Sequence, residues 1–201
     1  MLPPMNPDAP ALRLFVAIEL PDDVRAALER TVEALRRAGI DREVRWVRPE
    51  GIHITLKFLG PTPQPRLPEI ERALSAALAG VRGFRLQPGE LGAFGGRRNL
   101  LVVWVGVGGD TQPLSALAGR VEAALAPLGF PTEQRPFAAH LTLARVRDET
   151  PPAERERTHD ALQRVRMPGV PAIDVRAVSL MQSELGRGGA RYHALATFPL
   201  E

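Results

Sequence analysis

Residues 12–20 alternate between aliphatic and other side chains, so every second residue shares one face of an extended chain. This two-residue period is typical of a strand with one buried face. In residues 21–38 the apolar positions lie three and four apart, with Pro21 at the start and Gly39 after the end, which is typical of a helix. Similar patterns predict further strands at residues 44–47, 52–59, 84–91, 100–107, 139–146, 173–182 and 190–198, and further helices at residues 67–79 and 111–128.

Neighbouring strands with no helix between them indicate the fold class. Residues 84–91 and 100–107 are joined by a short glycine-containing turn, and so are residues 173–182 and 190–198. Strands connected in this way pair antiparallel, because a parallel pair needs a long crossover. The predicted fold class is therefore α+β and not a doubly wound parallel sheet.

The organisation of the chain is that of one domain. No linker rich in proline, glycine and serine divides residues 1–201, and residues 1–10 are predicted to be a flexible lead-in without the features of an export signal. The polar residues 148–167 are interpreted either as a weak helix or as a mobile loop. No run approaches the roughly 18 apolar residues of a membrane span. We therefore expect a cytoplasmic protein with no membrane partner.

Composition excludes some chemistry and leaves a phosphate partner open. The chain has no cysteine, which rules out disulfides, thiolate catalysis and cysteine-ligated metal sites. Lys57 is the single lysine among 26 basic residues, and the formal net charge is +3. Guanidinium groups suit phosphate, although an excess of arginine is also typical of a GC-rich coding bias. The charge thus permits an anionic partner without requiring one.

Two tetrapeptides share the order histidine, apolar residue, threonine, leucine. One begins at His53 and includes Thr55, and the other begins at His140 and includes Thr142. Each lies in a predicted strand, where residues two apart point to the same face. Each unit therefore presents an imidazole beside a hydroxyl, and two such units facing each other form a cleft with two of each group.

These groups suit the hydrolysis of a cyclic phosphodiester. One imidazole can accept a proton from water while the other protonates the departing oxygen, since the pKa of an unperturbed imidazole is about 6.5. The threonine hydroxyls can donate to the non-bridging oxygens. This chemistry needs no metal or other cofactor, and we expect none. The alternatives are half-buried structural histidines and a two-histidine metal site, which lacks nearby acidic residues to complete a ligand set.

The residues around both tetrapeptides resemble a known family. The matching segments are residues 46–60 (WVRPEGIHITLKFLG), 135–145 (RPFAAHLTLAR), 13–18, 183–185 and 189–192. In these segments the sequence resembles the 2H phosphoesterases, and most of all their RNA 2′,3′-cyclic phosphodiesterases, also called 2′-5′ RNA ligases. The resemblance covers nearly the whole chain. One departure is Ala139, where the family often has proline.

The resemblance implies both a fold and an activity. The implied fold has two pseudo-symmetric lobes of antiparallel sheet plus helices that flank a central groove, within a single bilobal domain. The implied enzyme opens the 2′,3′-cyclic phosphate at RNA ends or on oligonucleotides to a 2′-phosphomonoester, with reversible 2′-5′ ligation. His53 would be the proton donor and His140 the proton acceptor. We expect a monomer.

Further substrate-binding residues follow from the same comparison. Arg145 matches a phosphate-contacting arginine of the family, but it lies five residues after the second histidine, so a bulge must turn it to the same face. The rings of Phe58, Tyr192 and Trp46 are predicted to stack on a base, with core packing as the alternative. Lys57 shares the strand parity of the first histidine and is expected to border the groove.

A second interpretation comes from a different class of protein. A nucleotide- or RNA-binding module can keep the same groove without turnover. The intact histidine and threonine pairs in both halves of the sequence favour the enzyme. Hydrolysis of a small cyclic nucleotide by the purified protein discriminates between the two.

Overall fold

The computed structural model describes residues 11–186 and 189–201. Their strands are β1 (Ala11–Glu19), β2 (Val44–Trp46), β3 (His53–Pro63), β4 (Phe84–Phe94), β5 (Val102–Gly109), β6 (His140–Val146), β7 (Ile173–Val175), β8 (Ala177–Gly186) and β9 (Gly189–Pro199). Their helices are α1 (Asp22–Arg37), α2 (Leu67–Leu78), α3 (Thr111–Leu125) and α4 (Pro152–Leu162), with short 3-10 turns η1 (Pro49–Gly51), η2 (Gln64–Arg66) and η3 (Ala126–Leu128). The predicted α+β class is confirmed, and part of the polar stretch forms α4. The predicted lead-in at residues 1–10 lies outside the described residues.

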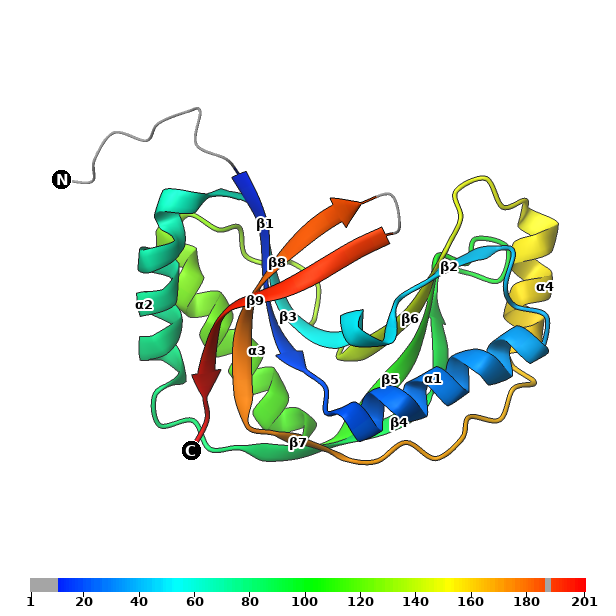
Figure 1. Cartoon of the computed structure of the whole chain (residues 1–201), viewed down its shortest axis with the longest axis horizontal. Coiled ribbons are helices and arrows are strands. Elements are labelled where there is room, and N and C mark those ends of the chain that lie inside the picture. The colour runs from blue at the N-terminus through cyan, green and yellow to red at the C-terminus, as the bar shows by residue number, and fades with distance from the viewer. Residues whose placement is uncertain (1–10, 187–188) are drawn as a thin grey trace.

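One curved antiparallel sheet joins two halves of the molecule (Figure 1). The strand order is β7-β4-β5-β6-β3-β1-β8-β9, and β2 pairs with the edge of β6. At the centre, β3 and β6 share a single residue pair, Ile54 with Leu141. The sheet thus has a first half of β1, β3, β8 and β9 and a second half of β2, β4, β5, β6 and β7, with a narrow junction between them.

Helices α1 and α3 each lie beside the half of the sheet that does not contain the strand before them. Figure 1 shows α2 and α3 beside the first half and α1 and α4 beside the second. Helix α1 follows β1 of the first half, whereas α3 follows β5 of the second half and contacts β3 of the first. The chain therefore exchanges helices between the halves, and apolar residues from both form one continuous core.

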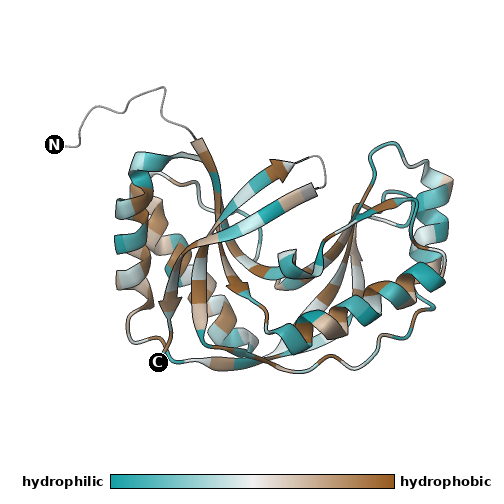
Figure 2. Ribbon diagram, in the orientation of Figure 1, coloured by the Kyte–Doolittle hydropathy of each residue, from teal (hydrophilic) through white to brown (hydrophobic). Residues whose placement is uncertain are grey.

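The pattern of apolar residues explains how the helices pack. In α1 the buried side chains include Val24, Leu28, Val32 and Leu35, which are three or four residues apart and form one stripe. Figure 2 shows hydrophobic positions along the central strands and hydrophilic positions on the outward faces of the helices. None of the helices in the described part of the chain is long and apolar enough to span a membrane.

The predicted strand at residues 173–182 is two strands in the structure. β7 pairs with β4 of the second half, and β8 pairs with β1 of the first half. The chain changes partners at Arg176, which belongs to neither strand. The glycine-rich turn predicted beyond β8 includes residues 187–188, which lie outside the described residues.

Candidate active site

Both repeated histidines begin a strand beside the junction of the two halves. His53 is the first residue of β3 and His140 the first residue of β6. The next residues, Ile54 and Leu141, pair with each other and are 0% exposed, so they point into the core. Because successive residues of a strand point to opposite faces, both imidazoles lie on the other, open face of the sheet. The two imidazoles are close enough to interact electrostatically, because the charge of His140 lowers the pKa of His53.

Each imidazole is held by the same hydrogen bond. The Nδ1 of His53 lies 2.8 Å from the carbonyl oxygen of Gly51, and the Nδ1 of His140 lies 2.8 Å from that of Ala138. A carbonyl oxygen only accepts, so Nδ1 carries the proton and donates it in both rings. In the neutral form Nε2 then has a free lone pair. Because Nδ1 is engaged in both rings, Nε2 is the nitrogen that can accept a proton or, when protonated, donate one.

Aromatic side chains fix the ring of His53. Phe15 stacks on it with a centroid distance of 4.7 Å and an interplanar angle of 29°, and Tyr192 meets it edge-on at 5.1 Å. A side chain at Gly51 would approach the Tyr192 ring to 2.9 Å, so this glycine permits the tyrosine to pack there. In the second half, Phe94 meets the ring of His140 edge-on at 4.8 Å. Packing therefore restricts the rotation of both imidazoles.

Burial controls the charge of His53. Desolvation lowers its pKa to about 4, and the hydrogen bond to Gly51 and the charge of Glu19 oppose this change only partly. The charges of His140 and Arg145 lower the pKa further. His53 is therefore neutral at pH 7 in the free protein, with Nε2 unprotonated.

Glu19 is a residue of this site that the sequence interpretation missed. It pairs with His53 in the β1–β3 ladder, and the hydroxyl of Ser179 donates a hydrogen bond of 2.6 Å to its carboxylate. Ser179 also lies 3.3 Å from the hydroxyl of Thr197. The corresponding partner of His140 in the β5–β6 ladder is Gly106, so the two imidazoles have different electrostatic surroundings. One signal was available: Glu19 is the one acidic residue in the predicted strand at residues 12–20, where every other residue except Arg13 is apolar.

A bulge follows the first threonine. In the β1–β3 ladder Val16 pairs with Lys57 and Ala17 pairs with Thr55, which leaves Leu56 without a partner. The extra residue reverses the alternation of side chains. Phe58 therefore returns to the open face, where it is 68% exposed.

A matching bulge follows the second threonine. In the β5–β6 ladder Val103 pairs with Ala144 and Trp104 pairs with Thr142, which leaves Leu143 without a partner. Arg145 is consequently exposed on the same face as Thr142. The bulge that the sequence analysis required for Arg145 is present. The two halves thus place an aromatic ring, Phe58, and a guanidinium group, Arg145, at equivalent positions.

Comparison with known proteins identifies the family of this chain. The model of the 2′-5′ RNA ligase superfamily matches residues 14–187. The chain belongs to this superfamily. The family resemblance predicted from the sequence is confirmed.

Several members of this superfamily align with nearly the whole chain. An RNA 2′,3′-cyclic phosphodiesterase of Methanothermobacter thermautotrophicus is 31% identical over 94% of this chain and 99% of its own. Another, of Archaeoglobus fulgidus, is 33% identical over 93% and 99%. Among solved structures, TT0787 of Thermus thermophilus has a TM-score of 0.73 and 29% identity, covering 94% of this chain and 98% of its own. E. coli LigT complexed with 3′-AMP has a TM-score of 0.72 and 26% identity, covering 94% and 98%.

Two residues of this 2′-5′ RNA ligase superfamily chain lie away from the open face. Trp46 pairs with the buried Ala144, packs against the core and donates a hydrogen bond of 2.9 Å from Nε1 to Asp41. The structure therefore does not bring Trp46 to the face that carries the histidines, and its ring packs on the core side. Lys57 is turned inward by the bulge and is 6% exposed, so the expectation that it borders the groove is wrong.

Lys57 instead holds the segment before the second histidine. Its ammonium group donates to Glu122 of α3 at 2.6 Å and to the carbonyl oxygen of Pro131 at 2.7 Å. Glu122 also accepts a hydrogen bond of 3.0 Å from the backbone of Glu133. These contacts connect β3 to the chain that leads into β6. Within the described residues, no three histidine, aspartate or glutamate side chains are grouped so as to hold a metal ion.

Proposed function

We propose that this protein hydrolyses the 2′,3′-cyclic phosphate at RNA ends to a 2′-phosphomonoester by acid–base catalysis with His53 and His140. The observation that carries the proposal is the pair of imidazoles on one open face, each with Nδ1 bonded to a carbonyl oxygen and Nε2 available. The names of the relatives supply the substrate class. The first histidine as proton donor and the second as acceptor follow the family resemblance.

The reaction needs one proton transfer on each side of phosphorus. His140 takes a proton from water as the water oxygen bonds to phosphorus in line with the 3′ oxygen. The bond between phosphorus and the 3′ oxygen breaks, and His53 gives its proton to that oxygen. The products are a 2′-phosphomonoester and a free 3′-hydroxyl. With the 5′-hydroxyl of a second RNA in place of water, the same steps form a 2′-5′ linkage, and their reverse cleaves it.

A donor must be protonated in the complex, although His53 is neutral in the free protein at pH 7. The bound phosphate is anionic, and a nearby negative charge favours the imidazolium form. Substrate binding therefore raises the pKa of His53. The ring is then protonated in the complex and can donate this proton to the leaving 3′ oxygen.

The remaining residues on the open face have supporting roles. Thr55 and Thr142 donate hydrogen bonds to the non-bridging oxygens, and Arg145 compensates the charge that develops on them. Phe58 offers an exposed ring on which the terminal base stacks. Tyr192 is a second candidate, and the ring of Phe15 contacts both, with centroid distances of 6.2 Å to Phe58 and 5.3 Å to Tyr192.

The test is hydrolysis of 2′,3′-cyclic AMP by the purified protein after treatment with EDTA, with the product identified by phosphorus NMR. We expect turnover that does not need an added divalent ion and a product that is mainly 2′-AMP. Binding of the cyclic nucleotide without turnover would support the binding-module interpretation instead. Activity that is abolished by the chelator and restored by a metal ion would contradict a purely two-histidine mechanism, and mainly 3′-AMP would reverse the orientation of the substrate.

A further inference from the structure

Two arginines face each other across the β2–β6 ladder. Arg45 of β2 pairs directly with Arg145 of β6, and both side chains are exposed. On either side of Arg45, Val44 and Trp46 pair with residues whose side chains are buried. Side chains directly opposite in a ladder project from the same face. Arg45 therefore shares the open face that carries His140, Thr142 and Arg145.

This placement is unfavourable in the free protein. Like charges directly opposite in a ladder are destabilising. Within residues 11–186 and 189–201, neither Arg45 nor Arg145 forms an ion pair with a carboxylate, whereas Arg25, Arg66 and Arg97 each do. Glu43, two residues before Arg45, is half-buried, and its buried Oε2 has no hydrogen-bond partner among the described residues. A bound anion with two neighbouring negative charges would relieve the repulsion between Arg45 and Arg145.

We propose that Arg45 forms a second phosphate subsite, which binds the internucleotide phosphate next to the terminal cyclic phosphate of an RNA strand. This inference rests on the proposed function, in which Arg145 serves the terminal phosphate. The guanidinium fork is suited to bidentate contact with phosphate oxygens. With Phe58 in the first half and the two arginines in the second, the base of the terminal nucleotide lies over the first half and the strand continues over β6 and β2.

The subsite predicts a preference for chain length. A cyclic mononucleotide has one phosphate and contacts only Arg145, whereas an oligonucleotide also contacts Arg45. The enzyme is therefore selective for RNA ends over small cyclic nucleotides.

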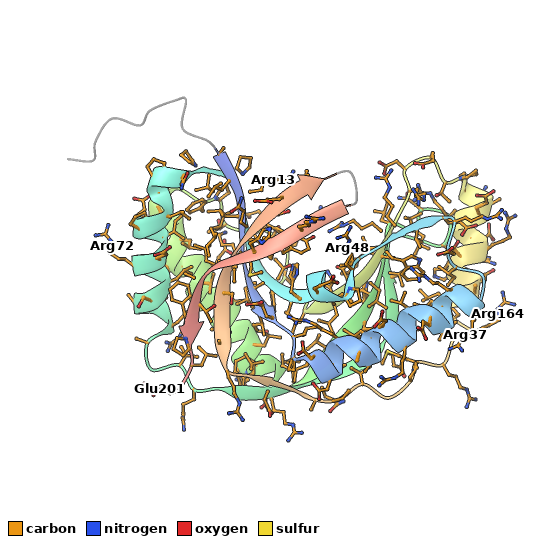
Figure 3. All side chains as sticks on the ribbon, in the orientation of Figure 1. Arg13, Arg37, Arg48, Arg72, Arg164 and Glu201 are labelled. Atoms are coloured by element: carbon orange, nitrogen blue, oxygen red, sulfur yellow. The ribbon has the colours of Figure 1, made fainter. Side chains whose placement is uncertain are left out.

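The experiment compares kcat/KM for 2′,3′-cyclic AMP and for the trinucleotide ApApA ending in a 2′,3′-cyclic phosphate. Arg45→Gln should lower the ratio of the trinucleotide value to the mononucleotide value about tenfold, mainly through KM, as for one hydrogen-bonded charge contact. The dependence of the trinucleotide value on salt should also weaken by about 0.7 in the log–log slope. Arg45→Lys should restore part of the ratio. Arg72→Gln removes an equal charge from the outer side of α2 (Figure 3) and should leave both substrates unchanged.

Two further measurements separate the possible failures. Because Arg45→Gln removes a like-charge repulsion, its melting temperature should not fall, which distinguishes a lost contact from a lost fold. If the wild-type protein hydrolyses neither substrate, the proposed function fails. The subsite is then tested by fluorescence anisotropy with the labelled trinucleotide, which the variant should bind about tenfold more weakly. A ratio, or in that case an affinity, that Arg45→Gln leaves unchanged would overturn the subsite.

Discussion

At the scale of single residues, the two histidines share an anchor but not an environment. Both donate Nδ1–H to the carbonyl oxygen two residues earlier. Glu19 lies opposite His53 in its ladder, and Gly106 lies opposite His140. The sequence repeat predicted two imidazoles on one face. It did not predict their difference, because that difference comes from strands outside the repeated motif.

We predict that His53 of the free protein titrates at about pH 4, because burial outweighs the groups that raise its pKa. The ring should therefore lose its proton as the pH rises through about 4 and be neutral above it. The product 2′-AMP should raise this pKa, since its phosphate is anionic. NMR of the His53 ring protons against pH, with and without 2′-AMP, measures both values. A free-protein midpoint at about 6.5, the unperturbed value, or one that 2′-AMP does not move, would contradict the assignment.

The same titration has a matched control. Glu19→Gln removes a negative charge that raises the pKa of His53, so the midpoint should move to lower pH. Glu29→Gln makes the same change on an exposed position of α1 and should leave the midpoint in place. The other groups around the ring, namely His140 and Arg145 of β6 and the phenol of Tyr192 of β9, are the same in both variants.

At the scale of elements, the bulges determine which residues of each motif reach the open face. Strand alternation alone places Lys57 on that face and Phe58 in the core, and the bulge at Leu56 exchanges them. For Arg145, the family resemblance indicated the correct face against simple alternation. The strands themselves were predictable from their two-residue period, but a bulge depends on the register of the neighbouring strand, which the local sequence does not encode.

The element-scale prediction concerns the ion pair behind β3. Lys57→Met leaves Glu122 without its cationic partner at a site where the lysine side chain is 4% exposed. The free energy of unfolding should fall by about 3 kcal/mol, as for other broken buried pairs. Adding Glu122→Leu should recover part of this loss, because no unpaired charge then remains. Urea unfolding of the wild-type protein, the single variant and the double variant measures the changes. A single variant as stable as the wild type would show that the pair contributes nothing.

At the scale of the whole molecule, the two halves of the sheet meet at one residue pair, which places the two histidine motifs side by side. The junction of Ile54 with Leu141 brings together two motifs that are 87 residues apart in the chain, as the numbers 53 and 140 show. The order of strands and helices was predictable from their periods. The exchange of α1 and α3 between the halves was not, because hydrophobic patterns state which face of a helix is buried but not which part of the sheet covers it.

The central claim is that His53 and His140 act as one acid–base unit. The most direct measurement is kcat/KM for 2′,3′-cyclic AMP with His53→Ala, His140→Ala and the double variant, each confirmed as folded by circular dichroism. Each single variant should lose about 10²–10⁴-fold, the usual worth of a proton-transfer group. The double variant should lose far less than the product of the two losses, since neither histidine completes the reaction alone. A folded single variant with near-wild-type turnover would remove that histidine from the mechanism and contradict the account.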